Sequence, residues 1–152
     1  MIYTSINHLI RPLSFVFQRD RIRKFAKVKL LQEINFNLRL IDVIEWKDVS
    51  IEFKNKIIGE FTIKEFENFL EVCSEDFLDI LSKKTFEFEN ENLDNSQPDK
   101  QELISGTINK IKTLQLIATF NKNFESDNRA KLEVRLRNIK KSLKELKQTL
   151  NS

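Results

Sequence analysis

Apolar residues are densest between Leu30 and Trp46, where they recur at helical spacing on more than one face. Two neighbouring rows are formed by Ile34, Leu38 and Ile41 and by Phe36, Leu40, Val43 and Ile44. A helix that is apolar over so much of its circumference has to be covered by other elements. We therefore expect this stretch to lie in the central helix of the fold, with the remaining chain supplying its neighbours.

The same periodicity predicts the elements that cover the central helix. The main helices are expected over residues 13–46, 62–82, 99–120 and 128–150. A short amphipathic helix over residues 2–10 should end or kink at Arg11, because a proline follows it. The chain holds only two glycines and two prolines in 152 residues, which favours long helices over turn-rich sheets. The predicted fold is all-α: a four-helix bundle with one long central helix and a short N-terminal amphipathic helix.

The last predicted helix has the most regular pattern, an apolar seam whose steps alternate between four and three residues. The seam consists of Leu132, Leu136, Ile139, Leu143, Leu146 and Leu150. Such a narrow stripe docks into one groove, either within this chain or on a second copy.

Residues 49–61 leave two interpretations open. Val49, Ile51 and Phe53 alternate with polar residues, which suits one strand of a small β-hairpin, but helical spacing fits nearly as well. Because a lone hairpin is marginal without packing support, we expect a short helix or irregular structure. The following Thr62 and Glu65 have the spacing of a capping box, in which the threonine hydroxyl accepts the amide hydrogen of the glutamate. The next predicted helix would begin there.

The first eighteen residues are expected to form a separate apolar segment, followed by a bundle domain over residues 19–152. The segment is divided by a charged residue and a proline, and it is shorter than a membrane span. We expect a cytoplasmic protein, with membrane association as an alternative. The residues expected to bind a partner in this segment are Ile6, Leu9, Ile10, Leu13, Phe15 and Phe17.

The net charge of +3 conceals a basic, an acidic and a second basic region. Residues 1–30 hold seven Arg or Lys against one Asp, residues 42–102 hold seventeen carboxylates against seven Lys, and residues 110–147 hold eleven Arg or Lys against four acids. These regions can neutralise one another, or the basic helices can bind an anionic membrane or a nucleic acid. The candidate polyanion-binding residues are Arg19, Arg21, Arg23, Lys24, Lys27, Arg135, Arg137, Lys140, Lys141 and Lys144.

Little in the sequence indicates catalysis. His8 is the only histidine and Cys73 the only cysteine, so triads that need histidine and thiolate zinc sites are disfavoured. A carboxylate ladder of Glu67, Glu71, Glu75 and Asp79 is better explained as a solvated or lysine-paired helix face than as a cation site. We expect no metal, no cofactor and no small-molecule substrate.

Glu33 and Asn37 interrupt the apolar flank of the central helix at i, i+4 spacing. They are expected either to be a buried polar pair that hydrogen-bonds across the bundle or to line a pocket. The function predicted from the sequence is a non-catalytic helical accessory module that binds a protein partner or itself through apolar helix faces. A peripheral binder of anionic membrane or nucleic acid is the alternative, and an enzyme of unknown type comes third.

Overall fold

The computed structural model describes residues 2–45, 49–74, 100–120 and 126–152, and these residues form an all-α helical bundle, as predicted. Its helices are α1 (Ile2–Ile44), α2 (Ile51–Gly59), α3 (Lys64–Ser74), α5 (Lys100–Phe120) and α6 (Ser126–Asn151). Within the described ranges there is no strand. The end of the second predicted helix, residues 75–82, and the residues that link it to the third predicted helix lie outside those ranges.

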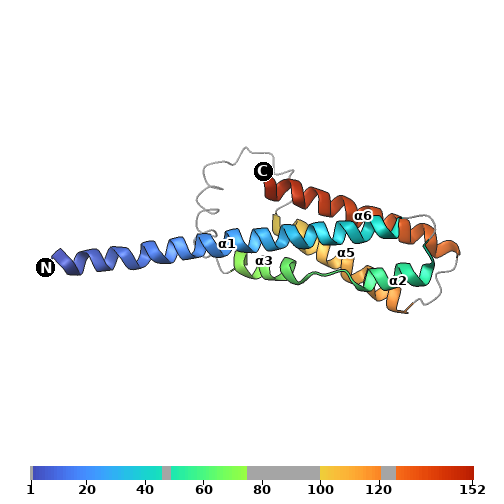
Figure 1. Cartoon of the computed structure of the whole chain (residues 1–152), viewed down its shortest axis with the longest axis horizontal. Helices are drawn as coiled ribbons and strands as arrows, with labels where there is room; N and C mark the ends of the chain where they lie inside the picture. Colours follow the sequence, from blue (N-terminus) through green and yellow to red (C-terminus); the bar gives the residue numbers. More distant parts are fainter. Residues whose placement is uncertain (1, 46–48, 75–99, 121–125) are drawn as a thin grey trace.

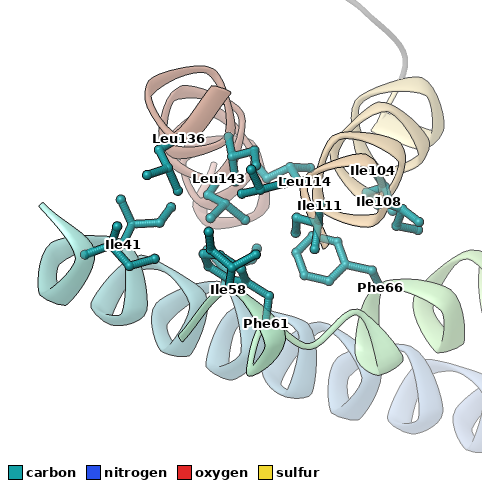
Figure 2. Packing of buried hydrophobic residues seen from close by; sticks show 14 of the residues in the cluster. Ile41, Ile58, Phe61, Phe66, Ile104, Ile108, Ile111, Leu114, Leu136 and Leu143 are labelled. Atoms are coloured by element: carbon teal, nitrogen blue, oxygen red, sulfur yellow. The ribbon is translucent and has the colours of Figure 1, made fainter. Parts of the chain in front are cut away.

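The helices of the bundle pack around one shared interior. Both α1 and α5 contact α6 on one side and the consecutive short helices α2 and α3 on the other. The short helices therefore fill together the position that a single helix takes in a regular four-helix bundle (Figure 1). Figure 2 shows labelled side chains such as Ile41, Ile58, Phe66, Ile111 and Leu143 converging in this interior.

The predicted N-terminal helix is not separate, because α1 runs without interruption from Ile2 through Pro12 to Ile44. A proline inside a helix removes one backbone hydrogen bond and costs about 3 kcal/mol, but its fixed φ is itself helical. One missing bond in a helix of 43 residues bends or weakens the ladder locally and does not have to end it. The prediction that the helix ends at Arg11 was therefore wrong.

Residues 51–59 form a helix, so the hairpin alternative was wrong and the preferred short helix was right. Ser50 caps its start, since the serine hydroxyl accepts a hydrogen bond from the Phe53 amide at 3.2 Å. Ile57 and Ile58 are both buried although they are adjacent in sequence. Adjacent side chains point to opposite faces of a strand but only about 100° apart on a helix, so only the helix buries both against one core.

The apolar seam of α6 is buried throughout, from Leu132 to Leu150, so its groove lies within this chain. The apolar flank of α1 is covered less completely than the sequence predicts. Its Ile34, Ile41 and Ile44 are buried, but Phe36 is 44% and Val43 is 43% exposed. Neighbouring helices cover one face of α1, and the second apolar row is only partly enclosed.

Candidate functional site

The N-terminal half of α1 extends beyond the ends of the other helices (Figure 1). From Phe17 to Lys29 no side chain of α1 is buried, and Leu30 is the first buried one among the described side chains of this helix. We call residues 2–29 of α1 the arm. Its side chains are described from Phe17 onward, and among them large apolar groups face solvent: Phe17 is 67%, Phe25 is 64% and Val28 is 51% exposed. Apolar groups left this open mark a surface for another molecule.

The predicted partner-binding residues all belong to the arm. Phe17 is exposed, as a contact residue must be. The backbone of the others is helical, while their side chains lie outside the described set: Ile6, Leu9, Ile10, Leu13 and Phe15. The structure thus joins this apolar segment to the bundle through one continuous helix.

The candidate polyanion-binding residues fall into two groups that the fold keeps apart. In the arm, Arg21, Lys24 and Lys27 are exposed, while Arg19 and Arg23 are half-buried. In α6, the exposed members are Arg135, Arg137, Lys141 and Lys144. Lys140 lies against Asp42 near the end of α1, and the 18 residues from Lys24 to Asp42 correspond to about 27 Å of helix. Lys140 is therefore far from Lys24 along α1.

Lys140 of α6 is paired with two carboxylates of the same molecule. Its Nζ donates to Glu45 Oε2 at 2.7 Å and to Asp42 Oδ1 at 3.1 Å, and these hydrogen bonds raise the pKa of the lysine above its usual range. Lys112 of α5 likewise pairs with Glu67 of α3 at 3.0 Å. These pairs are instances of the internal neutralisation between basic and acidic helices that the charge pattern allows.

Glu33 and Asn37 are both buried, and both hold the connection between α2 and α3 against α1. The Asn37 amide pairs with the Thr62 backbone in both directions: its Nδ2 donates to the carbonyl oxygen at 2.7 Å, and its Oδ1 accepts the amide at 3.1 Å. Glu33 Oε2 accepts the backbone amides of Glu65 at 2.7 Å and Phe66 at 3.0 Å. This carboxylate thereby caps the N-terminus of α3, where amides lack helical partners and the helix dipole favours negative charge.

The predicted capping box is therefore not the device that starts α3. The Glu65 amide, which the Thr62 hydroxyl was expected to satisfy, donates to Glu33 instead. A carboxylate from a neighbouring helix can satisfy two amides at once, which one local hydroxyl cannot do as well. The cap of α3 is thus a tertiary contact.

Gln115 is a third polar side chain in this arrangement, and it was not among the residues predicted from the sequence. Its Nε2 donates to the carbonyl oxygens of Phe61 at 2.9 Å and Ile58 at 3.3 Å, the first just after α2 and the second in its last turn. The sequence did contain a signal for this role, because Gln115 follows Ile104, Ile108 and Ile111 at core-facing helical spacing. A polar residue in such a position indicates a buried hydrogen-bonding role.

A hollow of about 800 Å³ lies between α2 and α5, and neither Glu33 nor Asn37 lines it. Its lining residues are Glu52, Asn55, Lys56, Gly59, Gln115, Ala118 and Thr119. The Asn55 Oδ1 atom is buried there without a hydrogen-bond partner. Among the described side chains no group of three or more His, Cys, Asp or Glu is placed to hold a metal ion. In the same part of the chain, no helix is both long and apolar enough to cross a membrane.

Comparisons of the chain with protein-family models, with curated proteins and with solved structures give no match.

Proposed function

We propose that this protein is a non-catalytic interaction module, in which the bundle anchors the arm and the arm contacts a partner. The observation that carries the proposal is the contrast in burial along α1: Phe17 and Phe25 are about two-thirds exposed, whereas Leu30 and Ile34 are fully buried. A helix that leaves its own bundle with aromatic side chains in solvent has apolar area available for binding.

The interior polar groups support a structural role for the bundle. Asn37 and Gln115 are directed at backbone groups of the α2–α3 connection and Glu33 at the first amides of α3, so that they hold the two short helices in place. Side chains committed in this way stabilise a scaffold, and the arm is left as the element that faces outward.

The proposal is tested in the full chain by changing both exposed arm aromatics, Phe17→Ser with Phe25→Ser. Because neither side chain is buried, the thermal midpoint of unfolding should stay within about 2 °C of the unmodified protein. Sedimentation velocity on both proteins, over a wide range of concentration, then measures self-association through the arm. A second copy as the partner predicts an oligomer that the double variant converts to monomer.

A strong fall in the thermal midpoint would contradict the proposal, because it would mean that the arm is part of the folded core. A monomer at all concentrations, with unchanged stability, would exclude only a second copy as the partner. The arm would then contact a different partner.

A further inference from the structure

Four described residues of the arm lie in one row along α1. Phe17, Arg21, Lys24 and Val28 follow one another in steps of four, three and four residues, so they share a helix face. All four are exposed: Phe17 by 67%, Val28 by 51%, the Lys24 side chain by 80%, and Arg21 also. We call this set the arm row. It combines apolar and cationic groups on one open face.

The sequence continues the arm row toward the N-terminus with apolar residues only. At the same helical spacing before Phe17 stand Tyr3, Ile6, Ile10 and Leu13, and the backbone there is helical. The row is thus apolar over its first turns and basic over the turns nearer the bundle. An interfacial helix has this composition, with apolar groups entering the acyl boundary and Arg or Lys lying among anionic headgroups.

The bundle does not obstruct this face. Phe17 and Leu30 are 13 residues apart, which at 3.6 residues per turn places them about 140° apart around α1. Because Leu30 begins the buried side of α1, the other helices pack on the side of α1 that points away from the arm row. A flat surface could therefore lie along the row while the bundle stays on its far side.

From these observations we propose that the arm row docks on an anionic lipid surface, with the helix lying in the plane of the membrane. This names the partner of the arm and so rests on the proposed function. Charge complementarity decides between a lipid surface and a second copy. In residues 1–30 seven cations face one acid, so two parallel arms would place Arg21 and Lys24 against their own copies. An anionic bilayer attracts the same groups.

The test is co-sedimentation of the full chain with vesicles of phosphatidylcholine alone and with vesicles in which about one-third of the lipid is phosphatidylglycerol. The unmodified protein should pellet with the anionic vesicles only, and added salt should weaken its binding. Arg21→Glu with Lys24→Glu should lower the partition coefficient by about 25-fold or more, since each cation contributes about fivefold near such a surface.

Two matched controls separate the arm row from general effects. Arg137→Glu with Lys144→Glu makes the same change in net charge on exposed residues of α6 and should leave vesicle binding within about twofold, because binding depends on charges at the surface itself. Phe17→Ser should weaken binding about tenfold, whereas Phe36→Ser, an exposed aromatic on the bundle part of α1, should not. Circular dichroism checks that each variant is folded.

Three results would overturn the lipid proposal. The first is failure of the unmodified protein to bind anionic vesicles. The second is an equal loss of binding in the arm and α6 charge variants, which would indicate attraction by net charge alone. The third is a protein that does not bind vesicles but binds RNA, or that dimerises in a way that Phe17→Ser abolishes. These results concern only the identity of the partner. The proposed function is tested separately, by the thermal midpoint of the Phe17→Ser with Phe25→Ser variant, so the arm would remain an interaction element with another partner.

Discussion

The two described halves of α1 are both rich in apolar residues, but they differ in how far those residues are buried. From Leu30 to Ile44, one face is buried and carries the interior of the bundle. From Phe17 to Lys29 no side chain is buried, and the large apolar residues Phe17, Ile22, Phe25 and Val28 are about half or more exposed. The difference is set by the neighbours: α2, α3 and α6 all contact α1, and the N-terminal part of α1 extends beyond them (Figure 1). Helical periodicity thus shows which residues share a face, but coverage by other helices decides whether that face becomes core.

The polar residues of the two halves differ in the same way. Glu33 and Asn37 are buried and bonded to backbone groups of another segment. Arg21 and Lys24 face outward, and Lys24 makes only a loose pair with Asp20 at 3.8 Å. Buried polar groups must find partners inside the protein, whereas exposed ones are available to a partner outside it.

The largest effect is expected at the buried half of α1. Ile34→Ala should lower the free energy of unfolding by about 2–5 kcal/mol, because the fully buried isoleucine leaves a cavity between packed helices. Urea denaturation followed by circular dichroism measures the loss. A change below about 1 kcal/mol would mean that the α1 interface is loosely packed.

The cap of α3 should give the next largest effect. Glu33→Ala removes the acceptor of two backbone amides and should cost about 1–3 kcal/mol of unfolding free energy. Glu33→Gln keeps a side-chain oxygen and should cost less than the alanine variant. Urea denaturation measures the loss of unfolding free energy in each variant. Equal losses would show that the carboxylate charge matters more than the hydrogen bonds.

A smaller effect is expected at Lys140. Lys140→Met should cost no more than about 1 kcal/mol at neutral pH, because Asp42 and Glu45 are substantially exposed and salt screens the pairs. The folded state raises the pKa of Lys140 above 10.5, so its stabilisation is complete below that pH and is lost as the pH rises through the raised value. The difference between the variant and the unmodified protein should therefore be constant from pH 7 to 9 and shrink in strong alkali.

Lys141→Met is the control for Lys140. Lys141 is exposed and lies 3.9 Å from Glu145 on its own helix, so its loss should change stability by no more than about 0.5 kcal/mol. A cost equal to that of Lys140 would mean that the contact between α6 and α1 contributes nothing specific.

The smallest effect is expected in the exposed half of α1. Ile22→Ala repeats the substitution made at Ile34, but because Ile22 is 49% exposed the free energy of unfolding should change by no more than about 0.5 kcal/mol. Urea denaturation under the same conditions makes the two values comparable. A loss similar to that at Ile34 would contradict the division of α1 into a core half and an arm.

Much of the fold could be predicted because the strongest signals were local. The seam of α6 and the core-facing row of α5 follow from spacing alone, and the helices formed over Lys100–Phe120 and Ser126–Asn151 lie close to the predicted ranges. The end of a helix at Arg11 was mispredicted because one proline does not outweigh the continuity of a long helix on both sides of it. The carboxylate that caps α3 was not foreseen because Glu33 is 32 residues away from the amide that it accepts.

By itself, the sequence determined the helical class, the faces of the helices and the segregation of charge, since all three depend on residue type and spacing. Only the tertiary structure decided which apolar face became core and which stayed open, since coverage depends on where distant helices pack. The same holds for the partners of Glu33, Asn37 and Lys140, because each is satisfied by residues far away in the chain. Local pattern determines what a residue can do, and packing between distant segments determines which of those possibilities is realised.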